Sequence, residues 1–182
     1  MASEVEEFTT LFQDFYPSLC RFLECLLGGR MALAQDLAQE SFLQLHRSAW
    51  SAMPPGEARF WLYRVARNFA INEFRKGQTH NKYFDRVVEV MSPRSRNPEE
   101  EYEAKERQLL VLDMWQSLPE DQRVALLLRE QEHLSYREIG TVLNISESKV
   151  KVDIFRARTA LRKDWIRRSR AGATVATKEL NR

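Results

Sequence analysis

The stretch from Leu118 to Arg162, LPEDQRVALLLREQEHLSYREIGTVLNISESKVKVDIFRARTALR, decides the fold. Within it, Ser135 and Glu138 have the spacing of a capping box, in which two side chains satisfy backbone N–H groups at a helix start. They predict a short helix over Tyr136–Leu143. Asn144 follows, and asparagine tolerates the left-handed backbone that a tight turn requires. The pattern predicts a helix that ends in a turn.

The residues around this turn predict a helix-turn-helix. Ser146 is placed to cap a last helix over Glu147–Arg168. Gly140 fits a crossing of two helices that is too close for a side chain. Ser117, two residues before a proline, is expected to cap the preceding helix. Four apolar residues would surround the crossing: Ile139, Leu143, Ile145 and Val150.

The expected last helix has two chemically different faces. Its apolar face, at steps of three and four, comprises Val150, Ile154, Ala157 and Leu161. The opposite face comprises Ser148, Lys151, Val152, Phe155 and Thr159, flanked by Arg156, Arg158 and Arg162. Such a helix can pack on one side and enter the major groove of DNA with the other, while its flanks bind phosphates. The alternative is a helical bundle whose basic surface helix is only solvated.

The first half of the chain also predicts helices, over Val5–Leu27, Met31–Arg47 and Ala58–Lys76. The second of these has a buried stripe at helical spacing: Ala34, Leu37, Ala38, Phe42 and Leu45. Residues 48–57 (SAWSAMPPGE) predict a loop, because Pro-Pro-Gly stops a helix. With six glycines and six prolines in 182 residues, the composition favours an all-α fold.

One stripe of the third expected helix lies apart from its core stripe: Trp61, Arg64, Asn68, Asn72 and Arg75. An exposed aromatic ring beside arginine and asparagine suits an unstacked nucleic-acid strand, because the ring stacks on bases and the cations bind phosphates. An ordinary amphipathic helix with one exposed aromatic residue would show the same periodicity. The stripe alone leaves both interpretations open.

Charge and chemistry restrict the function further. The net charge of +2 hides an acidic segment at Asn97–Glu106 and a basic one at Lys149–Arg170, and a basic helix suits nucleic acid or a solvated face. Cys20 and Cys25 are five residues apart on a helix, so we expect free thiols in a reducing compartment. Neither a signal peptide nor a membrane span is visible, which predicts a cytoplasmic protein without membrane insertion.

The chain lacks the patterns of an enzyme. Its three histidines, His46, His80 and His133, are scattered, and no set of metal ligands accompanies them. There is no phosphate-binding glycine loop and no nucleophile elbow. We therefore expect a protein that is not an enzyme and holds neither a cofactor nor a metal.

Two motifs together resemble bacterial sigma factors. Leu118–Arg162 is similar to domain 4, the carboxy-terminal promoter-binding domain. AQDLAQESFLQLHR (residues 34–47) followed by FWLYRVARNFAINEFRK (residues 60–76) resembles domain 2 of the extracytoplasmic-function class. The resemblance implies an alternative sigma factor that binds core RNA polymerase and directs it to −10 and −35 promoter elements.

The resemblance also implies an organisation into two small helical domains joined by a flexible linker. Domain 2 would cover residues 1–76, the linker 77–101, domain 4 residues 102–170, and a polar tail 171–182. Its partners would be promoter DNA, an anti-sigma factor and the polymerase, through the clamp helices of the largest subunit and the β-flap. The implied residues for binding the clamp helices are Asp36, Gln39, Glu40 and Gln44.

The DNA-binding residues implied by the resemblance fall into three sets. The −10 element would be bound by Trp61, Arg64, Asn68, Asn72 and Arg75. A base flipped out of the stack would be held in the loop by Trp50, Ser51, Met53 and Gly56. The −35 element would be bound by Ser146, Ser148, Lys149, Lys151, Val152, Phe155 and Arg156.

Three residues of the last helix depart from the family pattern, in which serine and arginine are expected. Asp153 would repel phosphate if it faced DNA. Val152 and Phe155 instead suggest an apolar contact with a thymine methyl group. A rival function is a stand-alone helix-turn-helix regulator that uses the first half as a sensor or dimerisation domain. The stripe at Trp61 and Arg64 argues against it, because a sensor has no need of such a stripe.

Overall fold

The structure is a computed structural model that describes residues 2–54, 56–77, 110 and 113–179. Side chains are described for residues 4–54, 56–76, 110 and 113–168. The expected linker therefore lies almost wholly outside the described residues, as do the acidic segment, His80 and Pro55. All the regular elements among the described residues are helices, with no strand, which confirms the all-α class. The elements are α1 (Ala2–Leu26), α2 (Met31–Arg47), η1 (Trp50–Ala52), α3 (Glu57–Gly77), α6 (Glu120–Glu130), α7 (Tyr136–Leu143) and α8 (Glu147–Glu179).

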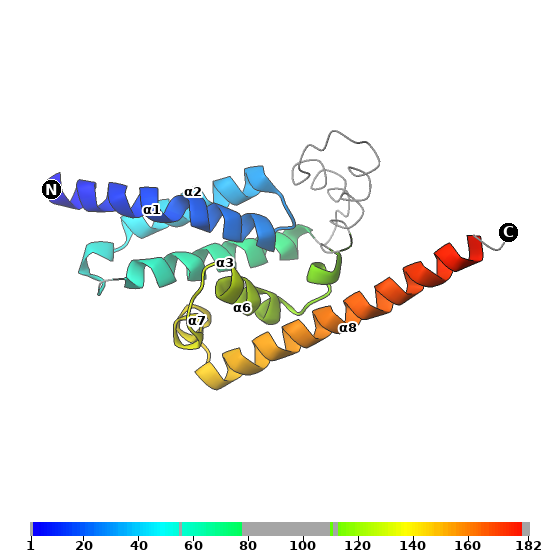
Figure 1. Ribbon diagram of the computed structural model, residues 1–182. Helices are drawn as coiled ribbons and strands as arrows, with labels where there is room; N and C mark the ends of the chain where they lie inside the picture. Colours follow the sequence, from blue (N-terminus) through cyan, green and yellow to red (C-terminus); the bar gives the residue numbers. More distant parts are fainter. Residues whose placement is uncertain (1, 55, 78–109, 111–112, 180–182) are drawn as a thin grey trace.

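Helices α1, α2 and α3 pack together as the first of two units (Figure 1). Their shared core is aliphatic and aromatic, and its members include Leu19, Phe22, Leu23, Leu26, Ala38, Phe42, Leu45, Leu62 and Ala66. Helix α1 is one helix that contains Pro17. Pro17 is exposed, where water can replace the one backbone hydrogen bond that proline removes. The turn after α1 uses Gly28 and Gly29, both with positive φ.

Helices α6, α7 and α8 form the second unit around the predicted turn. The capping box of α7 is complete: Ser135 Oγ accepts from Glu138 N at 3.2 Å, and Ser135 N donates to the Glu138 carboxylate at 2.7 Å. Asn144 adopts the left-handed conformation (φ 55°, ψ 47°). A Cβ on Gly140 would lie 2.8 Å from the carbonyl oxygen of Ile145. The helix-turn-helix prediction is thus confirmed at its caps, its turn and its crossing.

Two expected helix ends were wrong. Helix α6 begins at Glu120 after Pro119, and Ser117 is not its cap. The Ser117 hydroxyl instead donates to the Met114 carbonyl at 2.7 Å, because the preceding residues 113–116 are helical and leave carbonyls without partners. At the other end, α8 continues to Glu179 where a polar tail was expected from residue 171. Residues 171–179 contain no proline and include three alanines, which favour helix.

The two units pack directly against each other. Helix α1 contacts α6, and α3 contacts α7. The buried apolar side chains of both units form one continuous cluster that extends from Leu19 in α1 to Ala157 in α8. Figure 1 shows α8 running along the second unit, with its carboxy-terminal half projecting beyond the other helices. The first turns of α8, which carry the predicted −35 residues, lie at the end where α7 meets it.

Candidate nucleic-acid interface

The first turns of α8 present an exposed face. Its exposed members include all the predicted −35 residues: Ser146, Ser148, Lys149, Lys151, Val152, Phe155 and Arg156. Phe155 is 70% exposed and Val152 44%, the largest apolar exposures on this part of the helix. Burial of Val150, Ile154 and Ala157 on the opposite side fixes this orientation. The face combines two apolar side chains with cations, as the sequence predicted.

Asp153 does not belong to the exposed face of α8. It is 4% exposed, and its carboxylate accepts from the Lys149 ammonium at 2.6 Å. This arrangement removes the repulsion from phosphate that an outward-facing aspartate would cause. It also shows that Lys149, predicted to bind DNA, already has an ionic partner within its own helix.

Lys151 lies on the exposed face and is oriented by two neighbours. Its ammonium is 2.7 Å from the Glu147 carboxylate, one turn earlier, and 5.6 Å from the centre of the Tyr136 ring. The hydrogen bond to Glu147 raises the pKa of Lys151, so this side chain is a permanent cation at neutral pH. Such a cation can meet a phosphate without a change of protonation.

The predicted −10 stripe on α3 is divided. Asn68, Asn72 and Arg75 are exposed and available to a ligand. Trp61 is only partly exposed, because it packs against the core, so the prediction of an exposed aromatic ring was wrong. Arg64 is half-buried, and its guanidinium donates to the Thr141 and Val142 carbonyls of α7 at 2.6 and 3.3 Å.

Sequence reasoning missed a second polar stripe on α3, which faces the other unit. Arg67 contacts Glu120 and Asp121 at 3.1 and 2.7 Å. The Tyr63 hydroxyl donates to the Glu132 carboxylate, and Arg59 Nη2 donates to the Glu132 carbonyl at 3.2 Å. Residues 59, 63 and 67 recur at steps of four, and that periodicity was the available signal for a second contact face.

The Tyr63 hydroxyl is the most perturbed titratable group of this contact. Burial, followed by the hydrogen bond to the Glu132 carboxylate, raises the pKa of Tyr63. The phenol therefore stays protonated and remains a hydrogen-bond donor at neutral pH.

The loop between α2 and α3 contains η1 and separates the four predicted base-holding residues into two groups. Ser51 and Gly56 are exposed. Trp50 and Met53 are half-buried and pack against the core, and the Trp50 ring lies 5.4 Å from that of Phe8. Gly56 has φ +81°, a conformation that a side chain would strain. As the loop stands, the indole of Trp50 contributes to the fold of the first unit.

Helix α2 has a separate polar face opposite its buried stripe. Its exposed members include the predicted polymerase-binding residues Asp36, Gln39, Glu40 and Gln44. Leu43 is 50% exposed and lies three and four residues from Glu40 and Gln39, so it shares their side of the helix. Leu43 therefore adds one exposed apolar group to this polar face. Sequence reasoning missed Leu43.

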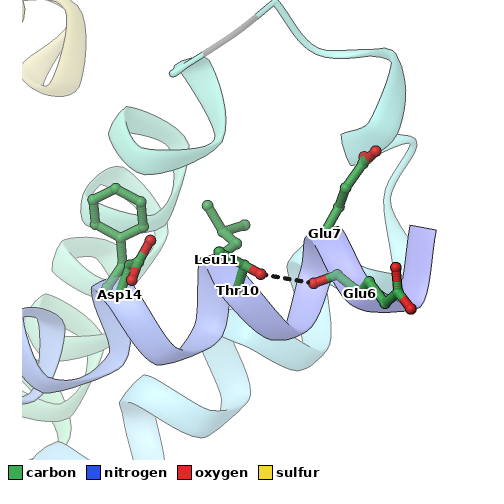
Figure 2. A pocket seen from close by; sticks show the side chains of 6 residues that line it. Glu6, Glu7, Thr10, Leu11 and Asp14 are labelled. Carbon is green, nitrogen blue, oxygen red and sulfur yellow. Dashed lines mark hydrogen bonds between the residues drawn. The ribbon is translucent and has the colours of Figure 1, made fainter. Parts of the chain in front are cut away.

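An open hollow of about 380 Å³ lies along α1 and is lined by Glu6, Glu7, Thr10, Leu11, Asp14 and Phe15. Figure 2 shows these side chains on one helix, with the Thr10 hydroxyl donating to the Glu6 carbonyl at 3.0 Å. Its three carboxylates make it unsuited to a phosphate, so it forms no part of a nucleic-acid surface.

The two cysteines show no sign of a reactive site. Cys20 and Cys25 are free thiols, and burial raises the pKa of each, which disfavours the reactive thiolate. The described residues contain no group of three or more side chains suited to a metal ion. No helix among them is long and apolar enough to span a membrane.

Comparisons with known proteins all indicate the same family. Residues 11–80 match the family described as sigma-70 region 2, and residues 108–161 match sigma-70, region 4. The chain is 30% identical over 157 residues to the ECF RNA polymerase sigma factor SigM of Bacillus subtilis, which covers 84% of this chain and 91% of that one.

Two further likenesses agree with this result. The chain is 35% identical over 143 residues to the RNA polymerase sigma-H factor of Pseudomonas aeruginosa, which covers 71% of this chain and 72% of that one. Its fold is similar to that of the sigma factor RpoE solved in complex with the anti-sigma factor NepR from Bartonella quintana. That match has a TM-score of 0.63 and 19% identity, and it covers 88% of this chain and 97% of that one. The chain therefore belongs to the sigma-70 family of RNA polymerase sigma factors, in its extracytoplasmic-function class.

Proposed function

We propose that this sigma factor binds core RNA polymerase and directs it to promoters through two DNA-binding faces, one on α3 and one on α8. The observation that carries the proposal is the exposed face of α8, where apolar and cationic side chains project together from a helix-turn-helix. A stand-alone regulator would explain that face, but it would leave the matches to sigma-70 region 2 and region 4 in one chain unexplained.

We assign −35 recognition to the first turns of α8. In the major groove the only apolar group on a base edge is the methyl of thymine. Phe155 and Val152 are exposed one turn apart on this face, so they suit a thymine-containing step. Lys151 and Arg156, exposed on the same helix, would meet the phosphates.

We assign −10 recognition to the exposed side of α3 and to the loop before it. Asn68, Asn72 and Arg75 offer hydrogen-bond donors and one cation along a single side of the helix. Ser51 and Gly56 lie in the exposed part of the loop, where an extruded base could be held. Trp61 and Trp50 would then hold α3 and the loop in place by packing against the core.

We assign polymerase docking to the polar face of α2, with Leu43 added to Asp36, Gln39, Glu40 and Gln44. Exposed carboxylates around one exposed leucine fit a partner surface that is basic at its rim and apolar at its centre. The second unit would bind the β-flap. The polymerase supplies the chemistry of RNA synthesis, so this protein needs no catalytic site of its own. We place it in the cytoplasm as an initiation factor.

The boundaries proposed from sequence remain our proposal: residues 1–76 for domain 2 and 102–170 for domain 4. We also propose an anti-sigma factor as a further partner, since the structurally similar RpoE was solved with one. Such a partner would cover the surfaces intended for polymerase and DNA.

Run-off transcription tests the function. Core RNA polymerase is incubated with a library of promoter fragments, with and without this protein. Transcripts that depend on the protein and share −10 and −35 motifs support the proposal and give its sequence preference. Tight sequence-specific DNA binding by the protein alone, without any dependent transcript, would instead favour the stand-alone regulator.

A further inference from the structure

The amino-terminal end of α1 extends beyond the part of the chain that matches the family. The match to sigma-70 region 2 begins at residue 11, whereas α1 begins at Ala2. Figure 1 shows this end of α1 beside the place where the chain passes from α2 to α3. That place is the loop assigned above to an extruded base. The first turns of α1 therefore lie next to a proposed −10 surface.

Phe8 is the residue of these turns whose ring contacts the loop. Its ring centre lies 5.4 Å from that of Trp50 in η1, and the two rings are tilted by 60°. The same ring meets His46 and Phe42 of α2 edge-on, at 5.0 and 6.2 Å. Edge-to-face contacts at roughly 4.5–7 Å between ring centres are favourable. Phe8 thus joins α1, the end of α2 and η1 in one aromatic cluster.

The loop depends on side-chain packing for its place beside α1. The backbone hydrogen bonds of the described loop residues join groups only three positions apart: Ala52 N to Ala49 O at 3.1 Å, Met53 N to Trp50 O at 3.0 Å, and Glu57 N to Pro54 O at 3.0 Å. Bonds of this range shape the chain locally and do not hold the loop against α1. Packing of Trp50 and Met53 against the core supplies the attachment that these bonds do not.

The position of Trp50 sets the position of the residues assigned to the base. Ser51 follows Trp50 directly within η1 and is exposed, and Gly56 is exposed at the end of the loop. Taking a base out of the stack has a free-energy cost, which the contacts that receive the base must offset. A loop that is already in place offsets more of this cost than one that must be ordered during binding. Fixing the indole therefore favours base capture.

We propose that Phe8 is a positioning residue for −10 recognition: by packing against Trp50, it holds the loop in the arrangement that receives the extruded base. The inference rests on the proposed function, because it concerns the loop assigned there to the base. Phe8 itself is assigned no contact with DNA. Its removal should slow base capture and leave polymerase binding and −35 binding unchanged, since those surfaces lie on α2 and α8.

A matched pair of variants tests the role of Phe8. Phe12 lies one turn later in α1, is also partly buried, and packs against Tyr16 and Phe42 at 4.6 and 4.9 Å. Phe8→Ala and Phe12→Ala each remove one partly buried ring beside Phe42, but the described ring contacts of Phe12 do not include Trp50. Phe8→Tyr keeps the ring and is the conservative rescue. Circular dichroism and thermal unfolding of the full-length proteins measure the general loss of stability in each variant.

Fluorine NMR with 5-fluorotryptophan reports the position of Trp50 without DNA or polymerase. The chain has four tryptophans, and Trp50→Phe identifies the Trp50 resonance by its disappearance. Phe8→Ala should shift that resonance and increase its sensitivity to exchange of H2O for D2O, whereas Phe12→Ala and Phe8→Tyr should leave it near its wild-type position. An unchanged Trp50 resonance in Phe8→Ala would overturn the proposal, whatever the outcome of any transcription assay.

Fluorescence of 2-aminopurine, placed at each position of the selected −10 element in turn, reports base extrusion by the polymerase–sigma complex. Phe8→Ala should slow the rise in fluorescence roughly three- to tenfold, the effect of ordering one side chain during binding. Phe12→Ala should stay within about twofold of the wild type, and Phe8→Tyr should restore the rate. Co-elution with core polymerase and binding to a −35 duplex should be unchanged in all three.

A double variant connects the two residues. If Phe8 acts through Trp50, then Phe8→Ala combined with Trp50→Ala should capture the base at the rate of Trp50→Ala alone. Additive slowing in the double variant, or equal slowing by Phe12→Ala, would overturn the proposal. Absence of base extrusion with the wild-type protein would instead refute the proposed function, and with it the role in promoter opening. The packing of the loop by Phe8 is measured separately by the NMR experiment.

Discussion

The ammonium of Lys149 lies 2.6 Å from the carboxylate of Asp153 one helical turn later, and this pair gives the buried carboxylate an ionic partner. The Asp153 side chain is 6% exposed, whereas that of Lys149 is 48% exposed. We predict that Lys149→Ala lowers the free energy of unfolding by about 1–3 kcal/mol, because it leaves a buried carboxylate unpaired. Urea denaturation measures the loss.

Two controls separate pairing from general charge effects. Lys151→Ala removes a cation of the exposed face and should change stability little. Lys149→Ala combined with Asp153→Ala should recover part of the loss, since no unpaired charge remains. Equal destabilisation by the single and double variants would contradict the explanation.

The close crossing of α7 and α8 predicts that any side chain at Gly140 lowers the stability of the folded protein. A Cβ there would lie 2.8 Å from the Ile145 carbonyl oxygen, a backbone atom that cannot rotate away. Gly140→Ala should therefore destabilise the protein by about 1–3 kcal/mol, although alanine is the better helix former. Thermal unfolding compares it with Thr141→Ala at the adjacent exposed position. A Gly140→Ala protein as stable as that control would mean that the turn relaxes easily.

The capping box of α7 predicts a pH dependence of stability. Hydrogen bonds from the Ser135 side chain and backbone lower the pKa of Glu138 below its usual value of 4.5. A lowered folded-state pKa stabilises the protein above about pH 4.5, and that stabilisation is lost as the pH falls through the folded pKa. The melting temperature of the wild type should thus exceed that of Glu138→Gln more at pH 7 than at pH 3.

Ser135→Ala gives an independent check on the same cap. It removes the acceptor for Glu138 N and should lower the free energy of unfolding by about 1 kcal/mol at pH 7. A difference between wild type and Glu138→Gln that stays constant from pH 7 to pH 3 would exclude a role for the carboxylate charge.

The apolar contact assigned to Phe155 predicts sensitivity to a single methyl group. Replacing thymine by deoxyuridine within the selected −35 element removes only that methyl. Binding of the polymerase–sigma complex should weaken about three- to fivefold, as expected for one buried methyl. The same replacement should have no effect on Phe155→Ala. Deoxyuridine outside the −35 element is the control, and equal weakening in both proteins would exclude the contact.

The polar face of α2 predicts a selective loss of polymerase binding. Asp36→Lys with Glu40→Lys, or Leu43→Asp alone, should abolish co-elution with core polymerase and hence run-off transcription. Both changes affect exposed positions, so circular dichroism and melting should match the wild type. Asp14→Lys, on the exposed side of α1, is the matched reversal that should leave co-elution intact. Equal loss in that control would indicate a nonspecific charge effect.

Features set by local chemistry could be predicted from the sequence. The Ser135–Glu138 box, the left-handed Asn144 and the close crossing at Gly140 each depend on residues within a few positions of one another. The same holds for the exposure of Phe155, which follows from the burial of Val150 and Ile154 at helical spacing. Ser117 was the exception, because its hydroxyl bonds backward to Met114 and Pro119 starts the helix.

Features that depend on contact between the units could not be predicted. Arg64 bonds to carbonyls 77 and 78 positions away, and Tyr63 to a carboxylate 69 positions away. Periodicity places a residue on a face but does not say what covers that face. The same limit applies to Trp61 and Trp50, which were assigned to DNA and pack largely against the core of the first unit.

The continuous apolar cluster that joins the two units would also govern how the protein behaves if they were to separate. Side chains from α1 and α6 that now shield each other would face water, and newly exposed apolar surface promotes self-association. A chain whose two units had separated would therefore tend to self-associate. At higher concentration such a chain would remain monomeric for a shorter time, unless another protein covered its apolar surface first. By covering that surface, the polymerase would also keep the protein in solution.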